Sequence, residues 1–150
     1  MKIIIDANIV FSAILNSNGK IGSLLINPLP FFYFIAPSFL RIEISNHYDR
    51  LIKMSNLTFA QLLESEYYIY KSITFISEEL ICKENWLFAN QLVADIDPKD
   101  VVYIAFSQQF DCKLWTGDKK LINGLIKKNY HNIWTTDDLF TLKNSKQFFE

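Results

Sequence analysis

The stretch Lys2-Ile3-Ile4-Ile5-Asp6-Ala7-Asn8 constrains the fold more than any other part of the chain. Three consecutive isoleucines predict a short strand that is buried on both faces, as in a parallel sheet covered by helices on each side. The apolar run ends at Asp6, which is expected at the carboxyl end of this strand, where open α/β sheets bind ligands. Asn8 can offer a neutral oxygen there or cap the next helix. Asp6 alone fits a simple helix cap equally well, so other parts of the chain must decide between a cap and a site.

Strands and helices alternate along the rest of the sequence. Further strands are expected over 31–35, 73–76, 113–116 and 132–135. Helices are expected over 9–15, 22–26, 39–54, from Thr58 onward, and over 77–93, 101–109, 121–126 and 136–142, followed by a loosely held tail to residue 150. This alternation predicts right-handed βαβ crossovers and a parallel sheet. A chain of 150 residues with no visible boundary is expected to form one α/β domain over 1–150.

Composition narrows the class of protein and its compartment. The chain is 50% hydrophobic and 15% aromatic, which favours a globular protein over a disordered one. Its net charge is −1, so any binding of nucleic acid must depend on a local basic group. Cys82 and Cys112 lie too far apart for a CxxC metal motif and fit reduced thiols. The start of the sequence lacks a signal-peptide pattern and no apolar run reaches about 20 residues, so we expect a cytoplasmic protein without a membrane span.

The helix expected over 39–54 carries a polar stripe. Glu43, His47 and Arg50 repeat at i, i+4 and i+7, which places them on one face of a helix. Such a stripe is usually a solvated face, and a histidine there is more often an ordinary surface residue than a catalyst. Because this helix follows directly after a strand, the stripe can instead look into the ligand crevice.

Acidic side chains fall at or just past the expected starts of several elements. They are Asp6, Glu43, Asp97, Asp100 and Asp118. Because the carboxyl ends of parallel strands share one edge of a sheet, these residues can converge there. Carboxylates that crowd together raise one another's pKa, and a hard divalent cation such as Mg²⁺ or Mn²⁺ relieves the repulsion. A site of this kind suits the hydrolysis of phosphodiester bonds. Each acid taken singly can also be a helix cap or a surface charge.

Four segments, taken in order, resemble the PIN domain family. They are Asp6-Ala7-Asn8 after a strand, Glu43 in the helix after the second strand, Asp97-Pro98-Lys99-Asp100 opening a helix, and Leu114-Trp115-Thr116-Gly117-Asp118-Lys119-Lys120-Leu121. The resemblance covers essentially the whole chain. It implies a three-layer α/β/α fold with a five-stranded parallel sheet in the order 3-2-1-4-5. It also implies a metal-dependent endoribonuclease, often the toxin of a toxin–antitoxin pair, with RNA as substrate and an antitoxin protein as partner.

The resemblance assigns roles to individual residues. The catalytic acids that it implies are Asp6, Glu43, Asp100 and Asp118. The ligands of Mg²⁺ or Mn²⁺ that it implies are Asp6, Asp97, Asp100 and Asp118. Thr116 matches the hydroxyl residue that lies near the last acid.

Basic residues are few near the expected site. The chain has only two arginines, Arg41 and Arg50, and lacks a basic tail. We expect the substrate-binding residues to be Asn8, Arg50, Thr116, Lys119 and Lys120. The alternative for the two lysines is that they are solvated residues on a surface helix.

A homodimer is expected from an excess of aromatic residues. The segment around Tyr67, Tyr68 and Tyr70 carries more rings than one core-facing helix face needs. Proteins that resemble this chain commonly pair through helices beyond the second strand.

Two functions of other classes stay open. Asp6-Ala7-Asn8-Ile9-Val10 also resembles the D-x-D-x-[TV] start of haloacid dehalogenase-type phosphatases, although Asn8 cannot donate a proton as the second aspartate of that motif does. The other alternative is a non-catalytic interaction module whose acidic pocket holds a cation.

Overall fold

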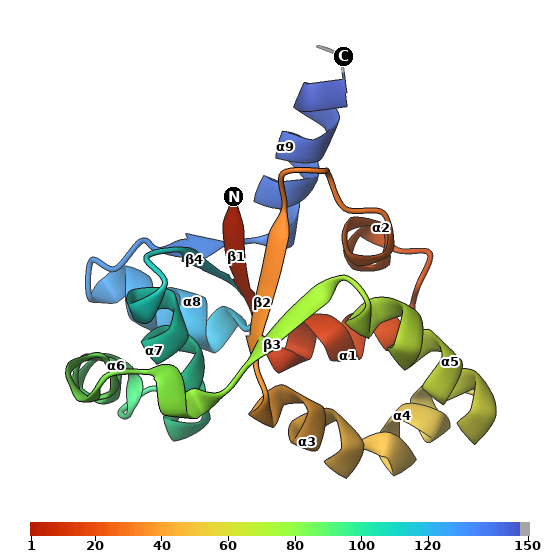
Figure 1. Cartoon of the computed structure of the whole chain (residues 1–150), viewed down its shortest axis with the longest axis horizontal. Helices are drawn as coiled ribbons and strands as arrows, with labels where there is room; N and C mark the ends of the chain where they lie inside the picture. The colour runs from red at the N-terminus through yellow and green to blue at the C-terminus, as the bar shows by residue number, and fades with distance from the viewer. Residues whose placement is uncertain (148–150) are drawn as a thin grey trace.

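The computed structural model describes residues 1–147, and in this part of the chain five parallel strands form one sheet (Figure 1). The strands are β1 (Lys2–Ile5), β2 (Tyr33–Pro37), β3 (Ile73–Ile76), β4 (Lys113–Trp115) and β5 (Ile133–Trp134). Their order is β3-β2-β1-β4-β5, and every neighbouring pair is parallel. The predicted α/β class and strand order are therefore confirmed.

The isoleucine run is the centre of this sheet. Ile3, Ile4 and Ile5 are each 0% exposed, and β1 pairs with β2 on one side and with β4 on the other. A strand in this position has helices on both faces, so apolar residues are needed at every position rather than at every second one. The carboxyl end of β1, where Asp6 follows, consequently lies at the middle of the sheet edge.

Helices cover both faces of the sheet and make the three layers (Figure 1). The α-helices of the described residues are α1 (Ala7–Leu15), α2 (Lys20–Ile26), α3 (Phe39–Asn46), α4 (Tyr48–Ser55), α5 (Phe59–Tyr70), α6 (Lys83–Val93), α7 (Val101–Gln109), α8 (Lys119–Lys127) and α9 (Thr136–Gln147). Helices α6, α7 and α8 lie on one side of the sheet, and α1, α2 and α5 lie on the other. Two short 3-10 helices, η1 (Glu78–Leu80) and η2 (Pro98–Asp100), precede α6 and α7.

Two predicted helices were wrong in their continuity. The helix expected over 39–54 is divided at His47, whose backbone N–H bonds to the Ile44 carbonyl three residues back and tightens the turn. The helix expected over 77–93 is interrupted at Ile81, which is extended (φ −83°, ψ 126°) and buries its side chain in the core. In both places a local backbone turn replaces a continuous helix, and hydrophobic periodicity alone does not reveal it.

The ends of other elements also differ from the prediction. Strand β2 begins at Tyr33 rather than at residue 31, because the Phe32 N–H closes a turn on the Leu29 carbonyl at 2.9 Å. Helix α9 extends to Gln147, five residues beyond the predicted end at Leu142. The Lys143 ammonium, which donates to the Ser23 and Asn27 carbonyls, ties this extension to α2. The last three residues of the expected tail, 148–150, lie outside the described residues.

Among residues 1–147, no single helix is long and apolar enough to cross a membrane. Helices α1 and α2 reach the required length and apolarity only when taken together across a bend of 105°. Val10 on α1 and Leu24 and Leu25 on α2 are buried in the core of the domain.

Candidate active site

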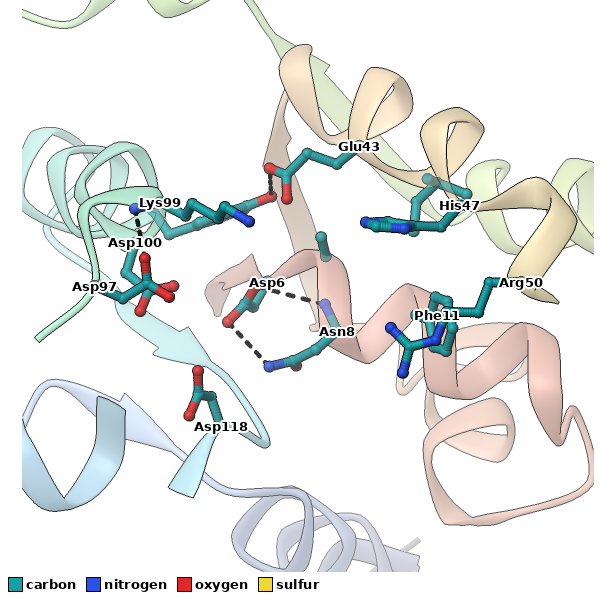
Figure 2. Close-up of a pocket in the computed structure, with 13 residues that line it drawn as sticks. Asp6, Asn8, Phe11, Glu43, His47, Arg50, Asp97, Lys99, Asp100 and Asp118 are labelled. Atoms are coloured by element: carbon teal, nitrogen blue, oxygen red, sulfur yellow. Dashed lines mark hydrogen bonds between the residues drawn. The ribbon is translucent and has the colours of Figure 1, made fainter. Parts of the chain in front are cut away.

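A cavity of about 310 Å³ opens beyond the carboxyl end of β1 (Figure 2). Five carboxylates line it: Asp6, Glu43, Asp97, Asp100 and Asp118. They come from four places in the sequence, namely the end of β1, helix α3, the turn η2 and the start of α8. The tertiary structure thus brings all of the predicted catalytic and metal-binding side chains to one cavity.

Asp6 serves both as a helix cap and as part of the cavity wall. It is 5% exposed, and its carboxylate accepts the Asn8 backbone N–H at 3.5 Å as the N-cap of α1. The other carboxylate oxygen accepts the Thr116 hydroxyl at 2.8 Å and the Asn8 side-chain amide at 3.3 Å. Burial raises the pKa of Asp6 from 3.8 to about 6, although the hydrogen bonds from Thr116 and Asn8 favour the charged form. The alternative between a cap and a site is therefore not exclusive, because one side chain does both.

Thr116 joins the ends of β1 and β4. It is fully buried, its hydroxyl donates to Asp6, and the same oxygen accepts the Asp118 backbone N–H at 3.1 Å. The Asn8 side chain adds a second link, because its carbonyl oxygen accepts the Gly117 N–H at 3.3 Å. Thr116 was predicted to bind substrate, but its burial places it as a support for Asp6 rather than as part of the solvent-facing wall.

Asp100 is also buried but lacks such support. It is 7% exposed, and its Oδ2 atom is buried with no hydrogen-bond partner among the described residues. Burial is the main cause that raises the pKa of Asp100 from 3.8 to about 7, and the charges of Asp6, Asp97, Asp118 and Glu43 add to it. An unpartnered buried carboxylate oxygen is costly, so this atom is where the site most needs a cation or a proton.

The other three carboxylates are each held by a defined partner. Asp97 is the N-cap of η2 and accepts the Lys99 backbone N–H at 3.0 Å. Asp118 is the N-cap of α8 and accepts the Lys120 and Leu121 N–H groups at 2.9 and 3.2 Å. Glu43 accepts the Tyr103 hydroxyl at 2.7 Å; burial raises the pKa of Glu43, while Tyr103, Lys99 and His47 lower it.

Cationic and aromatic residues occupy the opposite end of the cavity (Figure 2). The Arg50 guanidinium lies over the Phe11 ring, 5.2 Å from the ring centroid. The His47 ring is edge-on to Phe11, with 6.3 Å between the two ring centroids. Of the predicted basic residues, the structure brings Arg50 to the cavity, whereas Lys119 and Lys120 are exposed at the start of α8, outside its lining.

Several cavity residues had no role predicted from the sequence, among them Phe11, Lys99 and Tyr103. Phe11 follows Asn8 by three positions and Tyr103 follows Asp100 by three, so each shares a helix face with a predicted residue. Lys99 lies between two predicted acids. The three-residue spacing was the sequence signal for Phe11 and Tyr103, but ordinary core residues of a helix show the same spacing.

The donor atoms of the cavity decide whether a metal ion fits there. No group of three or more His, Cys, Asp or Glu side chains within residues 1–147 is gathered closely enough to hold a metal ion as it stands. Mg²⁺ does not require such a group, since it keeps several waters and usually takes only one or two carboxylates directly. The cavity offers oxygen donors, and the Asp100 Oδ2 atom lacks a partner among the described residues. A hard divalent cation therefore fits the side chains present.

Comparison with known proteins gives a family and a fold. The model of the PIN domain matches residues 4–144. Among solved structures, the chain is similar to one described as "Crystal structure of VapBC2 from Rickettsia felis bound to a DNA fragment from their promoter". That similarity has a TM-score of 0.60 at 13% identity and covers 90% of this chain and 97% of the other, which shows a shared fold. No protein with a curated description matches the sequence.

Proposed function

This chain belongs to the PIN domain family, and from that premise we propose that it is a metal-dependent endoribonuclease that hydrolyses phosphodiester bonds in RNA. The observation that carries the proposal is the unpartnered, buried Oδ2 atom of Asp100 in a cavity with four further carboxylates. Such a cluster is electrostatically unfavourable without a cation and favourable with one. Family membership and this cluster together support hydrolysis over simple binding.

We assign Asp6, Asp97, Asp100 and Asp118 as the residues that hold Mg²⁺ or Mn²⁺. When bound, the ion supplies a bound water of lowered pKa and stabilises negative charge on phosphate oxygens. Thr116 and Asn8 orient the Asp6 carboxylate through the hydrogen bonds described above. Glu43, oriented by the Tyr103 hydroxyl, completes the proposed catalytic set and is assigned to position the attacking water.

Substrate is proposed to be held through its phosphates. A cavity lined with carboxylates repels a phosphate backbone, and the net charge of −1 means that attraction must come from nearby cations. Arg50 lines the cavity and Lys119 and Lys120 follow Asp118, so we assign these three residues to phosphate contacts, with Asn8 beside the reacting group.

Two protein partners are also proposed. The similar solved structure is described as VapBC2 bound to promoter DNA, and by analogy we propose that this chain acts in the cytoplasm as the toxin of a toxin–antitoxin pair.

The second partner is another copy of the chain. Tyr67 and Tyr68 on α5 are 61% and 51% exposed, which supports the expected excess of aromatic surface there. Light scattering that reports a monomer at tens of micromolar would argue against the homodimer.

The phosphatase alternative is weakened by the environment of Asn8. Its amide donates to Asp6 and its carbonyl oxygen accepts from Gly117, so the side chain serves as a bridge and carries no acidic proton. A phosphatase of that type needs a carboxylic acid at this position to protonate its leaving group.

The test is an assay of RNA cleavage with Mg²⁺, Mn²⁺ or a chelator, on single-stranded and structured RNAs, with Asp6→Asn as the control. Cleavage that needs the metal and is lost in Asp6→Asn supports the proposal. Bound metal without turnover would identify a cation-binding module instead. Covalent phosphorylation of Asp6 by a phosphate ester would identify a phosphatase.

A further inference from the structure

The cavity has two chemically different ends, and the proposed metal ligands and catalytic acids lie at the acidic one (Figure 2). At the other end the Arg50 guanidinium lies over the Phe11 ring in a cation–π contact, with His47 edge-on to the same ring. We propose that Phe11, Arg50 and His47 form a nucleotide subsite, in which the base next to the scissile phosphate stacks on the Arg50–Phe11 pair. The subsite would make the enzyme select unpaired RNA.

Two helices supply the side chains of this subsite: α1 carries Phe11, and α4 carries Arg50 and begins after His47. Asp6 caps α1 and Phe11 lies five residues further along it, which is about 7.5 Å along the helix axis. Glu43 on α3, His47 between the two helices and Arg50 on α4 all line the cavity, so the division at His47 does not turn Arg50 away from it. On each side of the cavity an acidic residue near the sheet edge, Asp6 or Glu43, is therefore followed along the chain by a subsite residue that lines the same cavity.

Arg50 is free to bind an anion. The ion pairs among the described residues are Lys20–Asp137 and Lys128–Asp95, so no carboxylate of that part of the chain neutralises Arg50. Its guanidinium is instead held by an aromatic ring while the side chain stays exposed. A guanidinium plane both stacks against bases and donates to phosphate, whereas an ammonium offers only charge.

The geometry favours a single strand. A base can stack on an aromatic or guanidinium plane only if it is splayed away from its neighbours, which unpaired RNA allows readily. A duplex must first lose a base pair and its stacking, which adds a cost to binding. The cavity of about 310 Å³ is also at the lower limit for ligand pockets, so it suits one nucleotide rather than a helix.

This inference rests on the proposed function for the identity of the ligand, but its test does not require cleavage. The probe is a short single-stranded RNA that carries one 2-aminopurine, a base whose fluorescence is quenched when it stacks. Titrations use the full chain with Asp118→Asn to stop hydrolysis, in Mg²⁺, and the same RNA annealed to its complement serves as the duplex arm.

The key variants are Arg50→Lys and Phe11→Leu. Arg50→Lys keeps the positive charge and removes the planar guanidinium group. Phe11→Leu keeps an apolar side chain and removes the aromatic ring. Each is expected to abolish most of the quenching and to weaken binding about fivefold or more, the range seen for loss of one base–aromatic stack. Phe11→Tyr retains the ring and is expected to keep the parent signal.

The chain supplies a matched control. Arg41, its other arginine, also lies over an aromatic ring, 3.8 Å from the centroid of Phe75, but is not part of the cavity lining. Arg41→Lys makes the same chemical change elsewhere and should leave quenching and affinity unchanged.

The outcomes separate the subsite from the hydrolysis. Parent-like quenching in Arg50→Lys and Phe11→Leu, or equal binding of the duplex, would overturn the subsite even if the enzyme cleaves RNA. If quenching is lost in Phe11→Leu and Arg50→Lys but the parent protein never cleaves RNA, the subsite stands and the nuclease proposal is refuted. Failure of the parent to bind either RNA would overturn both.

Discussion

Asp6 and Asp100 are the two most buried carboxylates of the cavity, yet the protein holds them in different ways. Asp6 receives hydrogen bonds from Thr116 and from both the backbone and the side chain of Asn8. Asp100 leaves one buried oxygen without a partner among residues 1–147 and lies among four other acids. Burial raises the pKa of both, to about 6 for Asp6 and about 7 for Asp100, but only Asp6 has hydrogen bonds that oppose the rise.

Asp6 is thus a carboxylate that the fold orients, whereas Asp100 has an oxygen that no described residue orients. The ends of two paired strands, β1 and β4, hold Asp6 through Thr116 and Asn8. Asp100 ends a short 3-10 turn, where neighbouring acids repel it. A site assembled in this way has one carboxylate held in place and one that would gain most if a cation bound.

The largest expected effect is the loss of cleavage in Asp6→Asn and Asp100→Asn. Each variant should lose activity by more than about 100-fold, since even residues that only support metal ligands cost 10–100-fold. The two should differ in stability without metal. Asp100→Asn should be the more stable variant, because it removes a charge that has no hydrogen bond to one of its oxygens. Cleavage rates and thermal melts in chelator test both statements, and an unfolded variant would show that the acid is structural.

The next largest effect is expected for Thr116→Val, which removes a hydrogen bond to Asp6 and leaves the surroundings of Asp100 unchanged. The change leaves Asp6 without its 2.8 Å donor and the Asp118 N–H without an acceptor, at a cost of about 1–3 kcal/mol in unfolding free energy. Cleavage should fall about 10–100-fold, as for other groups that orient a metal ligand. Thr74→Val, the same change at an exposed position of β3, is the control and should leave both quantities near the parent values.

The pH dependence of thermal stability is a further test of the difference between Asp6 and Asp100. In the folded, metal-free protein the pKa of Asp100 is raised from 3.8 to about 7, so between these values the folded state binds a proton that the unfolded chain has released. The stability contributed by this proton is present at low pH and is lost as the pH rises toward 7. Thermal melts in chelator should therefore show a Tm several degrees higher at pH 5.5 than at pH 7.5, and Asp100→Asn should remove most of that difference. Equal slopes in the two proteins would mean that Asp100 is not the titrating group.

The smallest effects are expected at the cations around the site. Lys119→Ala and Lys120→Ala should each weaken binding to all RNAs about equally, since phosphate contacts carry no sequence information, whereas Arg50→Ala loses a phosphate contact together with the proposed stacking plane and should weaken unpaired RNA more than duplex. Each should also lower the slope of log affinity against log salt concentration by roughly 0.7. Lys127→Ala, at the far end of α8, is the matched control. If all three variants keep the parent slope, the lysines are solvated surface and RNA follows another path along the sheet edge.

The sequence carried enough information to predict the fold and the family. Buried parallel strands need continuous apolar residues, as in Ile3-Ile4-Ile5, and the alternation of strands and helices permits few topologies. Residues that follow a strand closely, such as Asp6 and Asp118, could be placed at the sheet edge for the same reason. The wrong predictions were local: the division at His47 and the extended residue Ile81 depend on single backbone turns that hydrophobic periodicity does not record.

Only the tertiary structure decided which side chains meet and which lack a partner. Thr116 and Asp6 are 110 positions apart, and Tyr103 and Glu43 are 60 apart, so their hydrogen bonds exist only once the sheet has formed. The cation–π contact of Arg50 with Phe11 likewise joins two helices whose separate patterns looked like ordinary amphipathic faces. The buried oxygen of Asp100 is a property of its whole surroundings, because burial and hydrogen bonding depend on every element packed around it.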